Sequence, residues 1–323
     1  FSPVWDTSLA LLALQEESLG QITTTHYEAC QWLKSRQLTN EKGDWQVNRP
    51  TLLGGGFAFQ YENSYYPDLD DTAVVAIALF QGNDHNLYDD VISRAANWLA
   101  GMQSQGGGFA SFDVDNTHYY LNEIPFADHG ALLDPPTADV SARCAMLFGV
   151  LQQNSYHPNL ISCIDYLLKS QEKNGSWFGR WGTNYIYGTW SVLVALEKVG
   201  FPANHPAIRK AVQWLKSIQN PDGGFGESNA SYFHSGGEVV PHPSTSFQTA
   251  WAILGLLAAG EEHSNTVQRG VQYLVDTQKK NGFWHEPYFT APGFPRVFYL
   301  KYHGYSKYFP LWALARFRNK IQR

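Results

Sequence analysis

Two kinds of helical segment alternate along the chain, and they differ in how apolar residues are distributed around the helix. Amphipathic segments such as "KAVQWLKSIQ" (210–219) are apolar on one side only, which is typical of a surface helix. Segments such as "TSFQTAWAILGLLAAG" (245–260) are apolar on all sides, which indicates a buried helix. No segment shows a convincing strand-like alternation. The pattern therefore predicts an all-α protein in which outer helices cover inner ones.

The amphipathic segments repeat one plan five times. In each, a helix is followed by a Gln, a short turn that contains Gly, and an aromatic residue. The Gly supplies the positive φ angle at which a helix can end, and the Gln amide can satisfy backbone groups that helix ends leave open. The pairs are Gln37 and Trp45, Gln103 and Phe109, Gln171 and Trp177, Gln219 and Phe225, and Gln278 and Trp284.

Six segments form the more apolar set. Six inner helices with outer partners close most simply into an (α/α)6 barrel, which we expect to be a single domain over residues 1–323. The loops before the inner helices are rich in Gly, Pro, Asp and aromatic residues, so a site could form where the N-termini of these helices gather. The segments span residues 4–14, 70–80, 138–152, 188–200, 245–260 and 309–319.

Three acids open one inner helix, in the stretch "YYPDLDDTAVV". A helix cap explains Asp68, because an Asp at this position accepts from free N–H groups. It explains Asp70 and Asp71 poorly, since Asp68 and Asp71 lie on one face of the helix, where like charges repel. Two functional interpretations remain: a Mg²⁺ site for a diphosphate, and a Brønsted acid that burial and neighbouring carboxylates keep protonated.

A Brønsted acid needs a neighbour that stabilises its anion, and "DPPTADVSAR" offers one. Asp139 and Arg143 are four residues apart on another inner helix, so they can pair. An ordinary ion pair without a catalytic role explains the same spacing. The many aromatic residues, 15% of the chain, favour acid chemistry. Protonation of a hydrocarbon gives a carbocation, which π faces stabilise without quenching.

Charge and cysteine positions exclude some classes of partner and of metal site. The net charge of −6 argues against a nucleic-acid partner. The cysteines at 30, 144 and 163 follow no metal-binding pattern, so we expect buried, reduced thiols of an intracellular protein. No segment has the roughly 18–20 apolar residues of a spanning helix. The stretch "DVDNT" (113–117) resembles the start of a calcium loop but lacks the later Gly and Glu, so no metal is expected there.

These motifs resemble those of the squalene-hopene cyclase family. "DLDDTA" is similar to the DxDD motif of class II terpene cyclases, and the Gln–Gly–aromatic repeats are similar to the QW motifs of triterpene cyclases. "SPVWDT", "FDVDNT", "DPPTADV", "QNPDGGFGE" and "GFPRVFYL" resemble stretches of this family in the same order. The resemblance covers nearly the whole chain but only the C-terminal half of the family. Since the chain also starts at Phe1 rather than Met, we expect it to be part of a longer protein.

The resemblance implies an enzyme of the isomerase or lyase type that converts squalene into hopene and hopanol, with no cofactor and no metal. Asp70 would protonate the terminal double bond of squalene, and Asp68 and Asp71 would flank and polarise it. Asp139 and Arg143 match a pair that assists the acid. Many members have His in place of Arg143, and since an Arg cannot relay a proton, its help here would be electrostatic.

The resemblance and the aromatic-rich loops together give candidates for substrate binding and cation stabilisation. Phe112 stands where members commonly have Tyr, so it keeps the ring and loses the hydroxyl. Phe126 matches a constriction in the substrate channel. The candidates are Trp5, Phe59, Phe112, Phe126, Trp181, Tyr187, Phe294, Phe298, Tyr302 and Tyr305.

The resemblance also implies partners. The family's cavity lies between two helical barrels, so this chain would supply the acid and one wall, and a missing N-terminal domain would supply the other. The full-length enzyme would be a monotopic protein on the cytoplasmic side of a bacterial membrane, and a homodimer is compatible with this. The chain alone would be soluble, and poorly active or inactive.

Three other interpretations stay open. Another class II cyclase could act on a diphosphate-bearing or partly cyclised prenyl chain, although "DPPTADVSAR" and "GFPRVFYLKYHG" favour squalene cyclases. A protein prenyltransferase β-subunit is also an (α/α)6 barrel, but its zinc-binding Asp, Cys and His set is not evident. A non-catalytic barrel would not explain three acids on an apolar helix.

Overall fold

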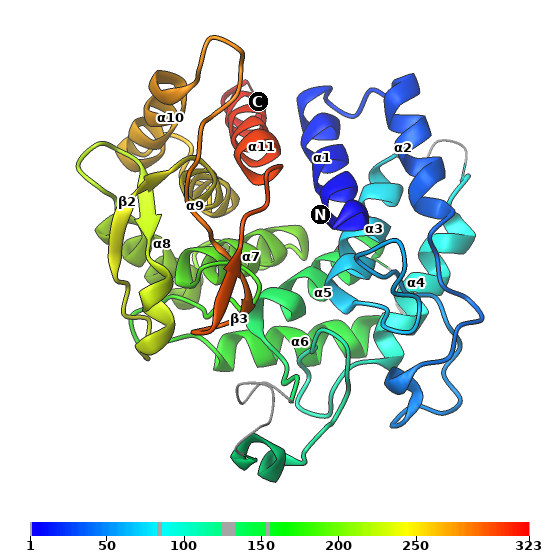
Figure 1. Ribbon diagram of the computed structural model, residues 1–323. Helices are drawn as coiled ribbons and strands as arrows, with labels where there is room; N and C mark the ends of the chain where they lie inside the picture. The colour runs from blue at the N-terminus through cyan, green and yellow to red at the C-terminus, as the bar shows by residue number, and fades with distance from the viewer. Residues whose placement is uncertain (1, 83–85, 125–132, 153–155, 323) are drawn as a thin grey trace. The chain divides into compact units, whose positions relative to one another are not determined.

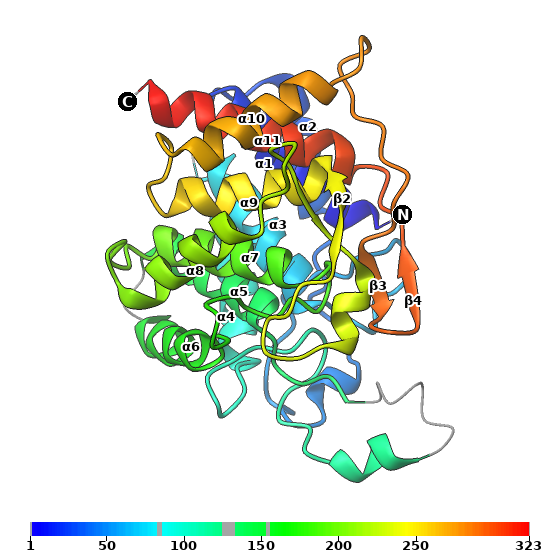
Figure 2. The ribbon, with the colours of Figure 1, turned by 90° about the vertical axis from the view of Figure 1, so that its left-hand side faces the viewer.

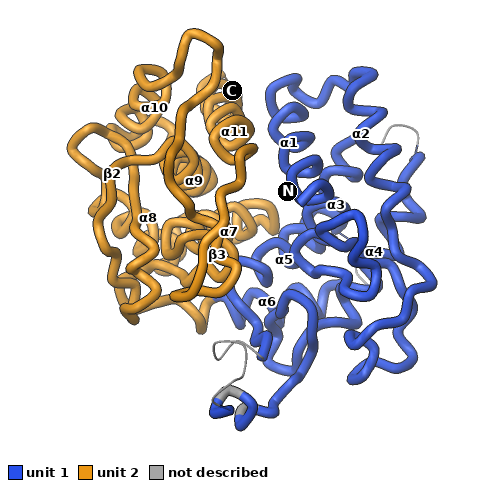
Figure 3. Tube along the Cα trace, viewed as in Figure 1, with its two compact units in different colours: residues 1–167 blue, residues 168–323 orange. Residues whose placement is uncertain are grey.

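The computed structural model describes residues 2–82, 86–124, 133–152 and 156–322. This part of the chain is mostly helical, as two views of the ribbon show (Figure 1, Figure 2). Its contacts divide the chain into two compact units, residues 1–167 and 168–323 (Figure 3). None of its helices has the length and apolar character needed to cross a membrane.

The first unit is built around three neighbouring inner helices. α3 (Leu69–Gln81) packs against both α1 (Pro3–Glu17) and α5 (Ala138–Leu151). The outer helix α2 (Thr24–Lys34) lies against α1 and α3, and α4 (Asp89–Gly101) lies against α3 and α5. The other elements are η1 (Asp44–Gln46), η2 (Tyr119–Glu123) and α6 (His157–Lys169), which contains the boundary between the units.

The second unit repeats this arrangement with its own helices. α9 (Ser246–Ala258) packs against both α7 (Tyr185–Lys198) and α11 (Tyr305–Ile321). The outer helix α8 (Pro206–Ser217) lies against α7 and α9, and α10 (Asn265–Thr277) lies against α9 (Figure 2). The shorter elements are β1 (Phe225–Glu227), η5 (Asn229–Phe233), β2 (Pro241–Thr245), β3 (Ala291–Phe294) and β4 (Phe298–Leu300).

Burial separates the inner helices from the outer ones. Every residue of α3 from Leu69 to Leu79 is buried, whereas α10 buries only Val267, Gly270 and Leu274. The buried positions of α10 are three and four residues apart, which is the spacing of one helix face. The predicted alternation of inner and outer helices is therefore confirmed.

Two short antiparallel hairpins lie in loops of the second unit, and the sequence pattern did not predict them. β1 pairs with β2, and β3 pairs with β4. These strands have three to five residues, which is too short to give a recognisable alternation of apolar and polar positions.

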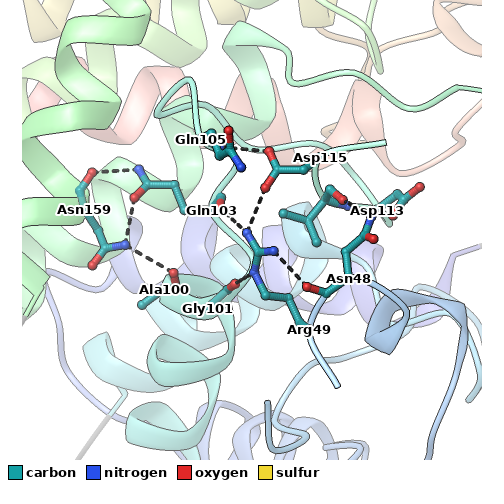
Figure 4. A network of polar contacts seen from close by, with 10 residues as sticks. Asn48, Arg49, Ala100, Gly101, Gln103, Gln105, Asp113, Asp115 and Asn159 are labelled. Carbon is teal, nitrogen blue, oxygen red and sulfur yellow. Dashed lines mark hydrogen bonds and ion pairs between the residues drawn. The ribbon is translucent and has the colours of Figure 1, made fainter. Parts of the chain in front are cut away.

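Four of the five Gln residues of the repeats connect successive outer helices, as Figure 4 shows for Gln103. Its Nε2 donates to the carbonyl of Gly107, in its own turn, at 2.7 Å and to the carbonyl of Asn159, at the start of α6, at 2.9 Å. Gln171 and Gln219 make the same two kinds of contact. The predicted role of the Gln amides at helix ends is confirmed, and it extends to the start of the next outer helix.

The first repeat differs from the prediction. Gln37 donates to the carbonyl of Gly55, eighteen residues further on, whereas the other Gln residues reach a Gly four residues on. Phe57 therefore occupies the aromatic position that we assigned to Trp45. Trp45 belongs to an insertion that contains η1, and its ring centroid lies 5.7 Å from that of Trp98. The predicted pairing of Gln37 with Trp45 was wrong because the insertion carries a Gly and a Trp of its own, at a spacing that resembles the repeat.

A second repeated contact fixes the start of the inner helices. The backbone N–H of Phe57 donates to the hydroxyl of Thr72 in α3, and that of Phe109 donates to the hydroxyl of Ser141 in α5, both at 2.8 Å. In four of the five repeats, the aromatic residue is thus held against the first turns of the next inner helix. In the second unit the pairs are Trp177 with Thr189, and Phe225 with Thr249.

Candidate active site

The three acids of the DxDD stretch lie together at the N-terminus of α3 and are almost completely buried. The exposed fractions of Asp68, Asp70 and Asp71 are 6%, 4% and 4%. Asp68 is the N-cap, because its Oδ1 accepts from the N–H groups of Asp70 at 2.7 Å and of Asp71 at 3.0 Å. The cap expected for Asp68 is confirmed, and it does not account for the other two carboxyl groups.

Arg143, on α5, brings a positive charge to Asp70. Its Nε lies 3.3 Å from Oδ1 of Asp70, and the two side chains are only 5% and 6% exposed. The contact is an ion pair without hydrogen-bond geometry, since Oδ1 of Asp70 has no hydrogen-bond partner. The guanidinium is held in place by other contacts: Nη1 donates to the backbone carbonyl of Asp139 at 3.0 Å, and Cζ lies 5.3 Å from the ring centroid of Trp5.

Asp139 lies one helical turn before Arg143 and is completely buried. Its Oδ1 accepts from the hydroxyl of Thr137 at 2.6 Å. The structure shows a hydrogen bond from Nη1 of Arg143 to the backbone carbonyl of Asp139, and the predicted ion pair between their charged groups stays a prediction. The carboxylate of Asp139 acts on Asp70 at longer range, where it raises the pKa of that acid.

Burial dominates the protonation of the three acids. It raises the pKa of Asp70 to about 7, an effect that the Arg143 guanidinium opposes and the Asp139 carboxylate reinforces. Burial, followed by repulsion from neighbouring carboxylates, also raises the pKa values of Asp68 and Asp71 well above their usual range. Near neutral pH, Asp70 can therefore hold a proton and can also release it, because its anion forms beside a guanidinium.

The magnesium interpretation fits this geometry poorly. Mg²⁺ favours ionised oxygens in an octahedral shell, whereas burial raises the pKa values of these acids and Asp70 faces a guanidinium. Within the part of the chain that the structure describes, no three His, Cys, Asp or Glu side chains are arranged to hold a metal.

Neighbouring residues engage the carboxylates of the "DVDNT" loop, as Figure 4 shows for Asp115 and Arg49. Asp113 accepts from the backbone N–H of Val114 and from the side-chain amide of Asn116. Asp115 pairs with Arg49 at 2.9 Å, and Arg49 also donates to backbone carbonyls at the end of α4. These carboxylates stabilise the loop that follows Phe112.

Asp70 and Asp139 occupy equivalent positions in successive repeats. Each lies two residues after the N-cap of its helix, which is Asp68 in α3 and Thr137 in α5. An alignment of "DLDDT" with "TADVS" would have predicted this relation from the sequence alone. The structure supports that alignment, because the hydroxyl at the end of each string accepts from the backbone N–H of the aromatic residue of its repeat.

Three of the four aromatic candidates in the first unit are among the described residues. Trp5 is beneath Arg143, and the rings of Phe59 and Phe112 meet edge to face with centroids 6.4 Å apart. Asp134, which the sequence analysis did not single out, accepts from the backbone N–H of Phe112 at 2.6 Å. Its charge also raises the pKa of the Asp68 carboxyl. Phe126 lies outside the described residues.

Four aromatic candidates of the second unit form two pairs near its β3–β4 hairpin and α11. The ring centroids of Phe294 and Phe298 are 5.3 Å apart, and those of Tyr302 and Tyr305 are 4.8 Å apart in a stacked arrangement. Their roles in substrate binding stay predictions.

The other two candidates of this unit differ in their surroundings. Trp181 lies in the loop before α7, with the guanidinium carbon of Arg180 4.2 Å from its ring centroid. Tyr187 is completely buried, and its ring centroid is 4.9 Å from that of Trp251. Packing alone accounts for the position of Tyr187, and a direct role toward substrate stays a prediction.

Comparison with known proteins decides the family. The family model of the squalene-hopene cyclase C-terminal domain matches residues 1–319. The chain belongs to the squalene-hopene cyclase family. It is 53% identical over 322 residues to the squalene–hopene cyclase of Zymomonas mobilis, covering 98% of this chain and 49% of that protein. It is 46% identical over 324 residues to the squalene–hopene cyclase of Alicyclobacillus acidocaldarius, covering 100% and 51%. The chain thus spans about half the length of these relatives.

Solved structures confirm the fold class. A variant of the type II terpene cyclase MstE from Scytonema superimposes with a TM-score of 0.68 at 20% identity, covering 98% of this chain and 88% of that one. The ent-copalyl diphosphate synthase of Streptomyces platensis gives a TM-score of 0.65 at 19% identity, covering 97% and 50%. The predicted all-α class, with the (α/α) barrel fold of terpene cyclases, is therefore confirmed. The prenyltransferase and non-catalytic alternatives are not favoured.

Proposed function

We propose that this squalene-hopene cyclase-family chain is the acid-bearing domain, a single (α/α)6 barrel over residues 1–323, of an enzyme that cyclises squalene to hopene and hopanol. The observation that carries the proposal is the buried carboxyl of Asp70, whose pKa is raised to about 7 and which lies 3.3 Å from Arg143. Such a group combines an available proton with a stabilised conjugate base.

Asp70 transfers its proton to the terminal double bond of squalene. The alkene π electrons form the new C–H bond, the Asp70 carboxylate keeps the electrons of the broken O–H bond, and a tertiary carbocation results. Each further double bond then attacks the cation in turn. Loss of a proton from the last cation gives hopene, and addition of water gives hopanol, so the reaction belongs to the isomerase or lyase type and requires no cofactor or metal.

The remaining candidates have supporting roles. Asp68 holds the start of α3, Asp71 flanks the acid, and Asp139 and Arg143 set its pKa in opposite directions. The aromatic candidates stabilise the successive cations through their π faces. Phe112, which has no hydroxyl, can stabilise a cation but cannot take a proton.

The proposed enzyme contains an N-terminal domain, which supplies the second wall of the cavity and excludes water from the cations. The half-length coverage of the relatives supports this partner. As a hydrocarbon, squalene resides in lipid, so we propose that the full-length enzyme, meaning this chain joined to its N-terminal domain, works at the cytoplasmic face of a bacterial membrane, as a monomer or a homodimer.

The test is Asp70→Asn in the full-length enzyme, with products of squalene measured by gas chromatography. The amide keeps the shape of the side chain but has no acidic proton, so we expect turnover to fall by roughly 10²–10⁴-fold, the usual contribution of a general acid. Asp90→Asn is the matched control, because Asp90 is 78% exposed on α4 and pairs with Arg94. Near-normal turnover by Asp70→Asn would exclude Asp70 as the acid.

A further inference from the structure

The loop that carries Trp181 has no regular secondary structure, yet it is tightly packed. A Cβ atom on Gly179 would lie 2.4 Å from the carbonyl oxygen of Asn184, and one on Gly182 would lie 2.4 Å from the ring of Tyr187. The loop therefore fits closely against the first turn of α7. Close packing alone does not fix the direction of its polar backbone groups, which need partners of their own.

Glu227, at the end of β1, accepts hydrogen bonds from the backbone N–H groups where the loop ends and α7 begins. Its side chain is 1% exposed, and its two carboxylate oxygens accept from the backbone N–H groups of Asn184 at 3.1 Å, Tyr185 at 3.2 Å and Ile186 at 3.0 Å. Asn184, the N-cap residue of α7, makes no side-chain cap of its own. A carboxylate more than forty residues away thus replaces the local cap and complements the positive end of the helix.

Two further side chains hold the preceding part of the loop. The hydroxyl of Tyr232 lies 2.6 Å from the carbonyl oxygen of Gly179 and 2.9 Å from that of Gly182, on either side of Trp181. Gln248 Nε2 donates to the carbonyl of Thr183 at 3.3 Å and to that of Glu227 at 3.0 Å. The loop, β1, η5 and α9 therefore share one buried polar network.

We propose that Glu227, through its three hydrogen bonds to the start of α7, is a positioning residue that fixes the Trp181 loop for stabilisation of a carbocation. The proposal rests on the proposed function, and it adds a residue that touches no reacting atom. A ring stabilises a cation only when its face is directed at the charge, and a displacement of about 1 Å can cost as much as 10²-fold in rate.

The geometry distinguishes this role from that of a base that takes the final proton. An ionised carboxylate has about four lone-pair sites, and those of Glu227 accept from three backbone N–H groups and from the side chain of Ser231, among which the carboxylate is buried. A base needs a free lone pair within hydrogen-bond reach of its substrate. The charge of Glu227 is thus directed at the helix.

The chain offers a matched control in Glu286. Its carboxylate is also buried, at 8% exposed, and it accepts from the backbone N–H of Ser246 at the start of α9 at 2.9 Å. Among the described residues, its hydrogen bonds go to Ser246 and to the backbone of Tyr288, and not to the Trp181 loop. Glu227→Gln and Glu286→Gln therefore each remove a negative charge and one acceptor oxygen from the start of an inner helix of the same unit, and we expect only the first change to affect the loop.

The experiment measures both variants, and Glu227→Asp, in the full-length enzyme. Hydrogen–deuterium exchange at residues 178–186 should become faster in Glu227→Gln and stay unchanged in Glu286→Gln. Squalene turnover to pentacyclic product should fall roughly 10- to 10²-fold in Glu227→Gln, with incompletely cyclised products appearing and KM unchanged. Glu227→Asp, which keeps the charge, should recover part of both effects.

Different results would exclude the positioning role of Glu227 and the proposed function. Unchanged exchange and an unchanged product pattern in Glu227→Gln would overturn the positioning role, as would the same product shift in Glu286→Gln. If the unmodified enzyme forms no cyclic product from squalene, the proposed function is wrong. Faster loop exchange in Glu227→Gln with a wild-type product pattern would show that the network is structural only, and would also overturn the proposal.

Discussion

Replacing Arg143 with Gln removes the positive charge beside Asp70 while it keeps a polar side chain on α5. At the observed separation of 3.3 Å, Coulomb's law gives an attraction of ~5 kcal/mol at an effective dielectric constant of about 20. Measured effects of such a neighbour on a carboxyl pKa are smaller, about 1–3, because protein and solvent relax. The pKa of Asp70 should therefore rise from about 7 by roughly 1–3 in the variant.

The direction of the effect on rate follows from the role of the anion. Arg143 stabilises the Asp70 carboxylate that forms during proton transfer, so its loss makes Asp70 a weaker acid. Since each pKa unit is worth about 1.4 kcal/mol and each 1.4 kcal/mol is tenfold in rate, the maximal rate should fall by at most about 10- to 10³-fold. In the wild type, activity should decrease as the pH rises through about 7, because the acid must be protonated. In Arg143→Gln this decrease should move to higher pH.

The assay is the initial rate of squalene cyclisation between about pH 5 and 9, with thermal melting as a check that the variant is folded. Arg143→Lys keeps the charge and should lie between the wild type and Arg143→Gln. Arg209→Gln, on the exposed face of α8, should match the wild type. A folded Arg143→Gln variant with an unchanged rate and pH profile would refute an electrostatic role for Arg143.

Two further predictions concern stability. The pKa of Asp70 is raised from 3.8 to about 7 in the fold. Between these pH values the folded state therefore binds more protons than the unfolded state. The free energy of unfolding should fall by ~4 kcal/mol for this group as the pH rises from about 4 to 7. Asp70→Asn should therefore gain stability over the wild type in urea unfolding at pH 8 but not at pH 4, and an equal difference at both would contradict the raised pKa. Gln103→Leu should lower the free energy of unfolding by about 1–3 kcal/mol, because its amide makes two backbone hydrogen bonds. Gln278→Leu should cost less than about 1 kcal/mol, because Gln278 is exposed and makes one such bond, and equal costs would contradict the connecting role of the Gln amides.

The periodic pattern predicted the helices well because burial on one side or on all sides is encoded locally. The same pattern missed the insertion before Gly55, since that segment carries a Gly and Trp45, which imitate the repeat. The short hairpins of the second unit were missed because their strands are too short to alternate.

In the candidate site, too, some features follow from the local sequence and others depend on the tertiary structure. The role of Asp68 as a cap follows from its place before an apolar helix, and the closeness of Arg143 to Asp70 follows from the equivalence of α3 and α5 in the repeat. Glu227 was not predicted, because its partners lie more than forty residues away and no local spacing marks the contact. A cap supplied by a distant segment is a property of the tertiary structure.

In the proposed mechanism, Asp70 delivers a solvent-exchangeable proton to squalene. The most direct measurement is mass spectrometry of the products that the full-length enzyme forms in D₂O, for the wild type and for Asp70→Asn. We expect one carbon-bound deuterium per product molecule in the wild type, and product formation that is slower by roughly 10²–10⁴-fold in the variant. Cyclic products without deuterium, or deuterated products at a normal rate from Asp70→Asn, would contradict this mechanism.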